Sequence, residues 1–305
     1  MNSGISIHRE HRLAGQGAIL LCAILWSTSG LFLRMVDWHP MVIAGPRSLL
    51  AGLLLFAIRL FAPAGKTGRK SAYLGTLLRD APSLAACGLS YAATMLLFVA
   101  ANKLTSSANA ILLQYAAPVW AALLGWFFLK ERPRWENWCA LAIVSFGMYL
   151  VFSGGLSAGR TAGALLGDIL ALVSGITFGA NSVILRAQKE RSPADIMLFA
   201  HIICVLVSIP FFFNHPPSMT FKNIICVVYM GIFQLGMASA LFAYGIKRVT
   251  AVQAMLTATI EPVLNPVWVL LAIGEKPAVS VITGGSVIIA AVVFSSILST
   301  LRRRN

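Results

Sequence analysis

The chain has 305 residues, of which 58% are hydrophobic and only 11% are charged. A soluble globular domain is nearer half apolar and a quarter charged, so this composition excludes an ordinary soluble enzyme, a disordered chain and a fibrous repeat. The formal net charge of +14 would suggest a nucleic-acid partner in a soluble protein. In so apolar a chain it favours a membrane protein with a basic cytoplasmic side.

The apolar residues gather in blocks that are long enough to cross a bilayer. A transmembrane helix needs about 20 apolar residues to span the hydrocarbon core. In chain order, the blocks that meet this length are residues 14–33, 40–62, 82–101, 105–129, 136–153, 163–185, 194–213, 222–245, 249–273 and 277–299. We therefore predict an all-α integral membrane protein with ten transmembrane helices and no soluble domain between them.

The basic residues predict the orientation of these helices. Of the 24 Lys and Arg, 18 fall on the side of the N-terminus in the ten-helix layout, five fall on the other side, and Arg47 lies inside the second block. Cytoplasmic loops carry the excess of basic residues, so both termini are expected in the cytoplasm of a cell with the protein in its plasma (inner) membrane. The basic residues sit at helix ends without interleaved aromatics, which argues against nucleic acid.

The second half of the sequence repeats the first. Residues 15–34 align with 167–186 at an offset of 152, and a second register, with an offset of 144, places Pro118 over Pro262 and Glu131 over Glu275. The chain therefore divides into two five-helix repeats, residues 1–155 and 160–305. An odd number of helices per repeat inverts the second repeat in the bilayer. Inverted repeats are typical of alternating-access transporters, although some channels also have them.

Both halves carry the same motif around a proline in their fourth helix. The sequence resembles the drug/metabolite transporter superfamily, and specifically its EamA-type ten-helix permeases, over essentially the whole chain. The residues that carry the resemblance are Tyr115–Trp120 leading to Leu129–Pro133, and Ile260–Val263 leading to Gly274–Pro277. The resemblance implies a secondary transporter, commonly an exporter, of small metabolites, amino acids or drugs, and it implies no particular substrate.

Glu261 is the most informative single residue. A carboxylate in the middle of a transmembrane helix costs roughly 2.5–3.5 kcal/mol on insertion scales. The repeat places Glu261 opposite Ala117 and Asn265 opposite Ala121, so the second half has polar groups where the first half has small packing residues. Glu261 either binds substrate or a proton, or it is a structural carboxylate that pairs with another helix.

Arg47 is the second charge inside a predicted span, and it keeps its charge in any environment. It can pair with a carboxylate, for which Glu261 is the obvious candidate, or it can extend towards the outer interface. A third interpretation is direct binding of an anionic group of the substrate. The second half has Ala200 and His201 in the corresponding neighbourhood, so the arginine is not duplicated.

Pro118 and Pro262 are expected to act as structural hinges. Each proline lacks an amide proton and leaves the carbonyl four residues earlier, at Gln114 and at Ala258, without its usual donor. The resulting kink can seat a ligand or can simply curve the helix.

Further polar and aromatic side chains within the blocks are candidates for lining a substrate cavity, although each could equally serve in packing. Together with Glu261 and Arg47, we predict substrate-binding roles for Asn265, Gln114, Tyr115, Trp120, Trp26, Asn181 and His201. Gln234 belongs to the same polar set. Glu131 and Glu275 are interpreted as turn residues beside prolines. Small residues recur every four positions in the sixth block, which predicts a close-packing face made of Gly163, Gly167, Ala171, Gly175 and Gly179.

Motifs of enzymes, metal sites and ATP-driven pumps are missing from the sequence. We therefore predict no enzymatic activity, no cofactor and no metal, and we expect transport driven by the proton gradient or by facilitated diffusion. The expected partners are a small-molecule solute, protons and the lipid bilayer, with the chain as a monomer or weak homo-oligomer. Two alternatives stay open, namely an importer or exchanger of an anionic metabolite that uses Arg47, and a membrane enzyme or sensor that transports nothing.

Overall fold

The structure is a computed structural model, and it describes residues 2–61, 70–105, 107–156, 163–188, 193–274 and 279–301. The elements in this part of the chain are all helical. In order they are α1 (Asn2–Ser27), α2 (Ser29–Met35), α3 (Pro40–Phe61), α4 (Lys70–Leu104), α5 (Ser107–Gln114), α6 (Ala117–Leu129), α7 (Trp135–Leu156), α8 (Ala164–Ala187), α9 (Pro193–Asn214), α10 (Phe221–Tyr229), the π-helix η1 (Met230–Met237), α11 (Ala238–Ile246), α12 (Ala251–Ala258), α13 (Glu261–Ile273) and α14 (Val279–Leu301).

Seven helical segments of the described residues are long and apolar enough to cross a membrane. They are Leu13–Leu33, Met41–Ile58, Ala110–Leu129, Ala164–Ala187, Met197–Asn214, Phe221–Ile246 and Ala251–Ala272. Pro82–Phe98 and Val279–Ser295 are shorter apolar helices. The protein is thus an all-helical, multi-pass membrane protein, and the fold class predicted from composition is confirmed at this level.

Several predicted spans are interrupted rather than straight. The range 14–33 breaks at Thr28 between α1 and α2, the range 105–129 breaks between α5 and α6, and the range 249–273 breaks between α12 and α13. The range 222–245 contains the π-helix, in which each backbone bond reaches one residue further than in an α-helix. Hydropathy predicted where these helices lie but did not predict the break at Thr28 or the π-helix.

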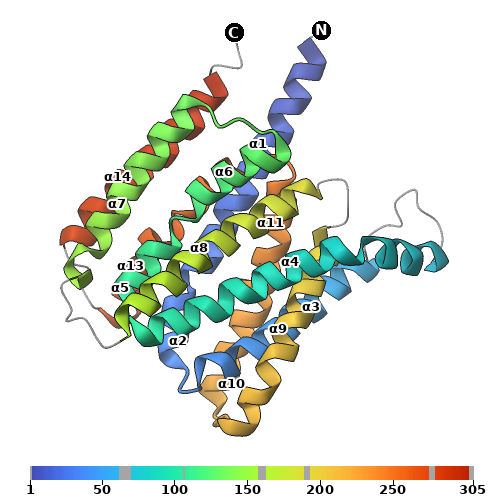
Figure 1. The fold of residues 1–305 in the computed structure, drawn as a ribbon, viewed down its shortest axis with the longest axis vertical. Coiled ribbons are helices and arrows are strands. Elements are labelled where there is room, and N and C mark those ends of the chain that lie inside the picture. Colours follow the sequence, from blue (N-terminus) through green and yellow to red (C-terminus); the bar gives the residue numbers. More distant parts are fainter. Residues whose placement is uncertain are drawn as a thin grey trace.

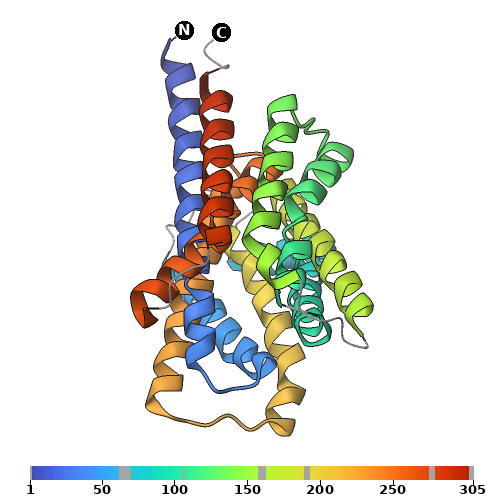
Figure 2. The ribbon, with the colours of Figure 1, turned by 90° about the vertical axis from the view of Figure 1, so that its left-hand side faces the viewer.

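Helices far apart in the sequence pack in pairs. In Figure 1, α7 and α14 lie side by side along one edge of the molecule, and this pair is among the most extensive helix contacts. The other extensive pairs are α3 with α9, α4 with α8 and α1 with α11. The start of α1 and the end of α14 lie at the same end of the molecule in both views (Figures 1 and 2).

Glycines allow α8 to approach α5 and α6 closely. A Cβ atom at Gly175 would lie 2.9 Å from the backbone oxygen of Gln114, and one at Gly179 would lie 2.9 Å from the backbone oxygen of Ala117. These distances leave no room for a side chain, so α8 contacts the backbone of α5 and α6 directly. The predicted small-residue face of the sixth block therefore does pack closely at these positions.

Candidate functional site

The breaks between α5 and α6 and between α12 and α13 occur at corresponding positions of the sequence. α5 and α12 end at Gln114 and Ala258, and α6 and α13 begin three residues later, at Ala117 and Glu261. In each case a proline occupies the first turn of the second helix. Proline cannot donate a backbone hydrogen bond, so the first helix of each pair ends four residues before the proline. The last residue of that helix is the one whose carbonyl was predicted from the sequence to lose its donor.

Glu261 and Tyr115 connect these two breaks. Tyr115 lies at the break between α5 and α6, and its hydroxyl lies next to the carboxyl group of Glu261, within reach of a hydrogen bond. Glu261 is the first residue of α13, where unpaired backbone amides favour a negative charge. Cys22 of α1 is an electrostatic neighbour of the carboxyl group. Two candidates that are distant in the sequence thus form one contact between broken helices.

The N-terminal helix packs beside α13 through a residue that the sequence did not single out. Trp268, seven residues after Glu261, donates from its indole Nε1 to Ser27 Oγ at 2.7 Å. Ser27 is the last residue of α1, directly before the break at Thr28. Asn265 lies between Glu261 and Trp268 on α13 and is half-buried. Nothing in the local sequence marked Trp268, because its partner lies in the other half of the chain.

Trp26, in the first half of the chain, lies against two aromatic rings of the second half. Its ring centroid is 5.3 Å from that of Phe242 on α11 and 6.3 Å from that of Phe178 on α8. Both separations are in the range of favourable aromatic contacts. Trp120 on α6 lies against α8, since a Cβ atom added at Gly179 would lie 2.9 Å from the Cβ atom of Trp120. Both tryptophans are partly buried.

Gln114 and Asn181 hold helices together through hydrogen bonds. The Gln114 side chain donates to Ser174 Oγ at 2.8 Å, which joins the end of α5 to α8. The Asn181 amide on α8 donates to the Cys87 carbonyl and to Ser90 Oγ on α4, both at 3.0 Å. Each of these polar groups is therefore satisfied within the protein, and the contacts fix α8 against α4 and α5.

Arg47 and His201 belong to a second group of polar residues, on α3, α9 and η1. Arg47 is 7% exposed, and its guanidinium donates to Gln234 Oε1 in η1 at 2.6 Å rather than to Glu261. His201 on α9 is fully buried, with Nε2 3.2 Å from Ser239 Oγ and the ring edge-on to Tyr91. The predicted pairing of Arg47 with Glu261 is absent from the described residues.

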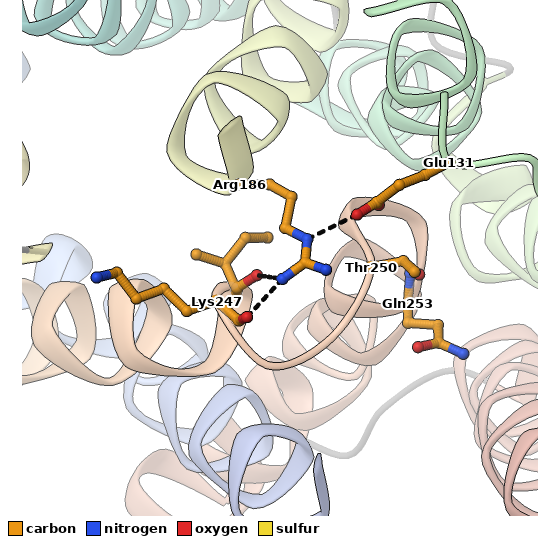
Figure 3. Close-up of polar contacts among 6 residues, drawn as sticks. Glu131, Arg186, Lys247, Thr250 and Gln253 are labelled. Atoms are coloured by element: carbon orange, nitrogen blue, oxygen red, sulfur yellow. Dashed lines mark hydrogen bonds and ion pairs between the residues drawn. The ribbon is translucent and has the colours of Figure 1, made fainter. Parts of the chain in front are cut away.

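Glu131 has a role that the turn interpretation missed. Its carboxylate accepts a hydrogen bond of 2.8 Å from Arg186 Nε, and Arg186 also donates to the carbonyls of Ile246 and Lys247 (Figure 3). Thr250, the N-cap of α12, is drawn in the same view, and its Oγ1 accepts a hydrogen bond from the backbone N–H of Gln253. Arg186 therefore joins the ends of α6, α8 and α11. Glu275, predicted to be the equivalent of Glu131, lies outside the described residues.

No group of three His, Cys, Asp or Glu in the described part of the chain could hold a metal ion. The five cysteines are free, and Cys139 is the exposed member of the set. The chemistry that these side chains offer is binding of polar or charged groups, through a carboxyl group at the helix breaks and a guanidinium beside η1.

Comparison with known proteins gives matches along nearly the whole chain. The EamA-like transporter family matches residues 13–153 and again residues 165–297. A protein of Archaeoglobus fulgidus named only as a transporter is 26% identical over 284 residues, covering 92% of this chain and 96% of its own length. A probable terminal-alkyne amino-acid exporter of Streptantibioticus cattleyicolor is 23% identical and covers 94% of this chain and 95% of its own. One solved structure, 19% identical, shares the fold with a TM-score of 0.80 over 96% of this chain and all of its own.

Proposed function

Because the chain belongs to the EamA-like transporter family, we propose that it exports small organic solutes across the membrane by alternating access. In this proposal ten transmembrane helices form two inverted repeats, residues 1–155 and 160–305. The substrate binds where the broken helices of the two repeats meet. Transporters with this architecture bind substrate near the middle of the bilayer, between discontinuous helices.

Matching boundaries of the helices support the two repeats. An offset of 144 relates α5 to α12, α6 to α13 and the start of α7 to the start of α14. It also relates the residues that end α6 and α13, Lys130 and Gly274, which both have positive φ angles, 57° and 76°. The family matches the chain twice, once in each proposed repeat.

The proximity of the Tyr115 hydroxyl to the Glu261 carboxyl group is the observation that carries the proposed site. It joins the two broken helices at their breaks, so a change in either residue can alter how the two repeats move against each other. A carboxyl group at this point can also hold a proton or a cationic group of a solute. We propose Glu261, Tyr115 and Asn265 as the centre of the site, with Trp26, Trp120, Gln114, Asn181, His201 and Arg47 as further binding residues.

Pro118 and Pro262 are the hinges of this proposal. They are the second residues of α6 and α13, directly after the breaks, where the backbone already departs from helical bonding. A proton gradient is the proposed driving force, with Glu261 as the group that takes up the proton. Metabolites, amino acids and drugs are the proposed solute classes, and the relative named as a probable amino-acid exporter supports the second of these.

The proposed location is the plasma (inner) membrane with both termini in the cytoplasm. The distribution of basic residues supports this orientation. The placement of the start of α1 and the end of α14 at one end of the molecule agrees with an even number of crossings (Figure 2).

Proteoliposomes test the proposed function directly. The purified protein is reconstituted into liposomes that are loaded with an isotope-labelled metabolite extract. The solutes that leave the liposomes are identified by mass spectrometry, with and without an imposed pH gradient. We expect Glu261→Gln and Tyr115→Phe to reduce transport at least about tenfold, the loss expected when an interaction worth about 1.4 kcal/mol is removed. Asp37→Asn, at an exposed carboxylate outside the site, is the matched control.

The outcomes separate the parts of the proposal. Full transport by Glu261→Gln would remove this residue from the site, and equal transport with and without the pH gradient would rule out proton coupling. If liposomes with correctly folded protein release no more solute than liposomes without protein, the proposal of transport itself is contradicted.

A further inference from the structure

Arg47 is a buried charge whose hydrogen-bonding capacity is only partly used. Its guanidinium donates to the Gln234 side chain at 2.6 Å, while Nε is buried and has no hydrogen-bond partner among the described residues. Gln234 lies at the middle of the 26-residue membrane segment Phe221–Ile246. The guanidinium therefore lies at the middle of this segment rather than at its end, where water could solvate it.

Within the described part of the chain, the groups recorded beside Arg47 carry no carboxylate. Its hydrogen-bond partner is a neutral amide, and its electrostatic neighbours are Tyr91, Cys204 and His201. Glu261 lies next to Tyr115, and Glu131 is paired with Arg186. A buried cation without a counter-charge is costly, particularly within a membrane, and such residues mark ligand pathways.

The position of Gln234 opposite Arg47 is fixed by close packing of η1 on α3. A Cβ atom at Gly231 would lie 2.6 Å from Leu50 Cβ, and one at Gly236 would lie 3.1 Å from Ala51 Cα. Two glycines therefore bring the backbone of the π-helix against α3 on either side of Gln234. π-Helical turns are frequent at functional sites because they place one side chain out of the regular register.

His201 offers a second unused group in the same neighbourhood. Its Nε2 lies 3.2 Å from Ser239 Oγ, and its Nδ1 is buried with no hydrogen-bond partner in the part of the chain that the structure describes. Tyr91 lies edge-on to the His201 ring, with the two ring centroids 5.5 Å apart. A histidine nitrogen can donate to an oxygen anion in one tautomer, as the arginine Nε does always.

We infer that Arg47, together with Gln234 and His201, forms a binding site for a carboxylate group of the transported solute. One guanidinium with neutral donors beside it suits the single charge of a carboxylate. The inference rests on the proposed function in assigning this carboxylate to the solute. This site is a second binding point in addition to the one at Glu261. The solute is therefore expected to carry a carboxylate, which binds beside η1.

Thermal unfolding of the purified protein in acetate tests this site, because acetate is the smallest probe with a methyl-bearing carboxylate. The unfolding midpoint is measured in sodium acetate, in sodium chloride and in sodium phosphate at equal ionic strength. We expect acetate to raise the midpoint of the unchanged protein by about 2–4 °C over chloride, as for a weakly occupied site. Arg47→Gln should lose this shift, whereas Arg132→Gln, at an exposed arginine, should keep it.

Gln234→Glu keeps the test decisive if Arg47→Gln does not fold. This variant places a carboxylate against Arg47 from within the protein, so it should fold and show no acetate shift. No acetate shift in the unchanged protein, or an undiminished shift in either variant at this site, would overturn the inference. A shift with phosphate alone would overturn the assignment to a carboxylate.

The unfolding assay and the transport assay test the two proposals separately. A protein that moves solutes in proteoliposomes but shows no acetate shift contradicts only the carboxylate site. A protein that shows the shift, loses it in both variants and moves no solute contradicts only the proposed function.

Discussion

Arg186 shows how one side chain can hold several helices at one end of the molecule. It donates to the Glu131 carboxylate and to two carbonyls at the end of α11, while its own backbone belongs to the last turn of α8 (Figure 3). A positive charge at the end of a helix also interacts favourably with the backbone carbonyls there. The side chains of Arg186 and Glu131 are 15% and 24% exposed, so water screens this ion pair only in part.

Arg186→Gln should lower the stability of the folded protein by about 1.5–3 kcal/mol, because a charged hydrogen bond is lost and the carbonyls of α11 lose a donor. The measurement is the unfolding midpoint in detergent. Arg132→Gln removes an exposed charge close to Glu131 and should leave the midpoint unchanged. Equal midpoints for the two variants would show that the contacts of Arg186 add no stability.

Glu261 and Arg47 could be identified from the sequence because each is a charge within an apolar block. Their partners could not be identified in this way. Tyr115 and Gln234 lie 146 and 187 residues away from the charges that they bind. Spacing along a helix predicts which residues share a face, but it does not predict which of several polar residues on other helices will meet that face.

Helix α8 illustrates packing at the scale of an element. Gly175 and Gly179, four residues apart, face the backbone of α5 and α6. A Cβ atom at either position would lie 2.9 Å from a backbone oxygen atom of those helices. Small residues permit this approach, and dispersion contacts between the two backbones then stabilise the pair.

Gly175→Ala should destabilise the protein by about 1–3 kcal/mol, the usual cost of overpacking a core, although alanine is the better helix former. Gly17→Ala is the control, since nothing lies within 4 Å of the Cβ position at Gly17 in α1. We expect a lower unfolding midpoint for the first variant and an equal or higher one for the second. A raised midpoint for Gly175→Ala would contradict the close contact with α5.

The helices themselves were predictable from hydropathy because their cause is local. Runs of apolar residues must form internally bonded helices in a bilayer. The breaks before Pro118 and Pro262 were also predictable, since proline removes a backbone donor wherever it occurs. The break at Thr28 and the π-helix had no such local signal, because they depend on how α2 and η1 fit against their neighbours.

At the scale of the whole molecule, the proposed topology makes opposite predictions for two loops. Arg132 follows α6 and Met219 precedes α10, and both are exposed. In the proposed orientation the first loop faces the cytoplasm and the second faces outwards.

Single cysteines at these positions test the orientation in intact cells, after the five natural cysteines are replaced. A membrane-impermeant maleimide should label Met219→Cys in intact cells and label Arg132→Cys only after permeabilisation. Labelling of Arg132→Cys in intact cells would reverse the orientation, and labelling of both would contradict the proposed number of crossings between them.

The sequence by itself determined the class of the protein, the positions of its apolar helices and the two charges within them. These properties follow from the cost of placing each residue in hydrocarbon, which depends on local composition. Only the tertiary structure decided that Glu261 meets Tyr115, that Arg47 meets Gln234 instead of Glu261, and that Glu131 binds Arg186. Such contacts depend on which helices pack together, and that choice is made by shape and by glycine-permitted approach across the whole chain.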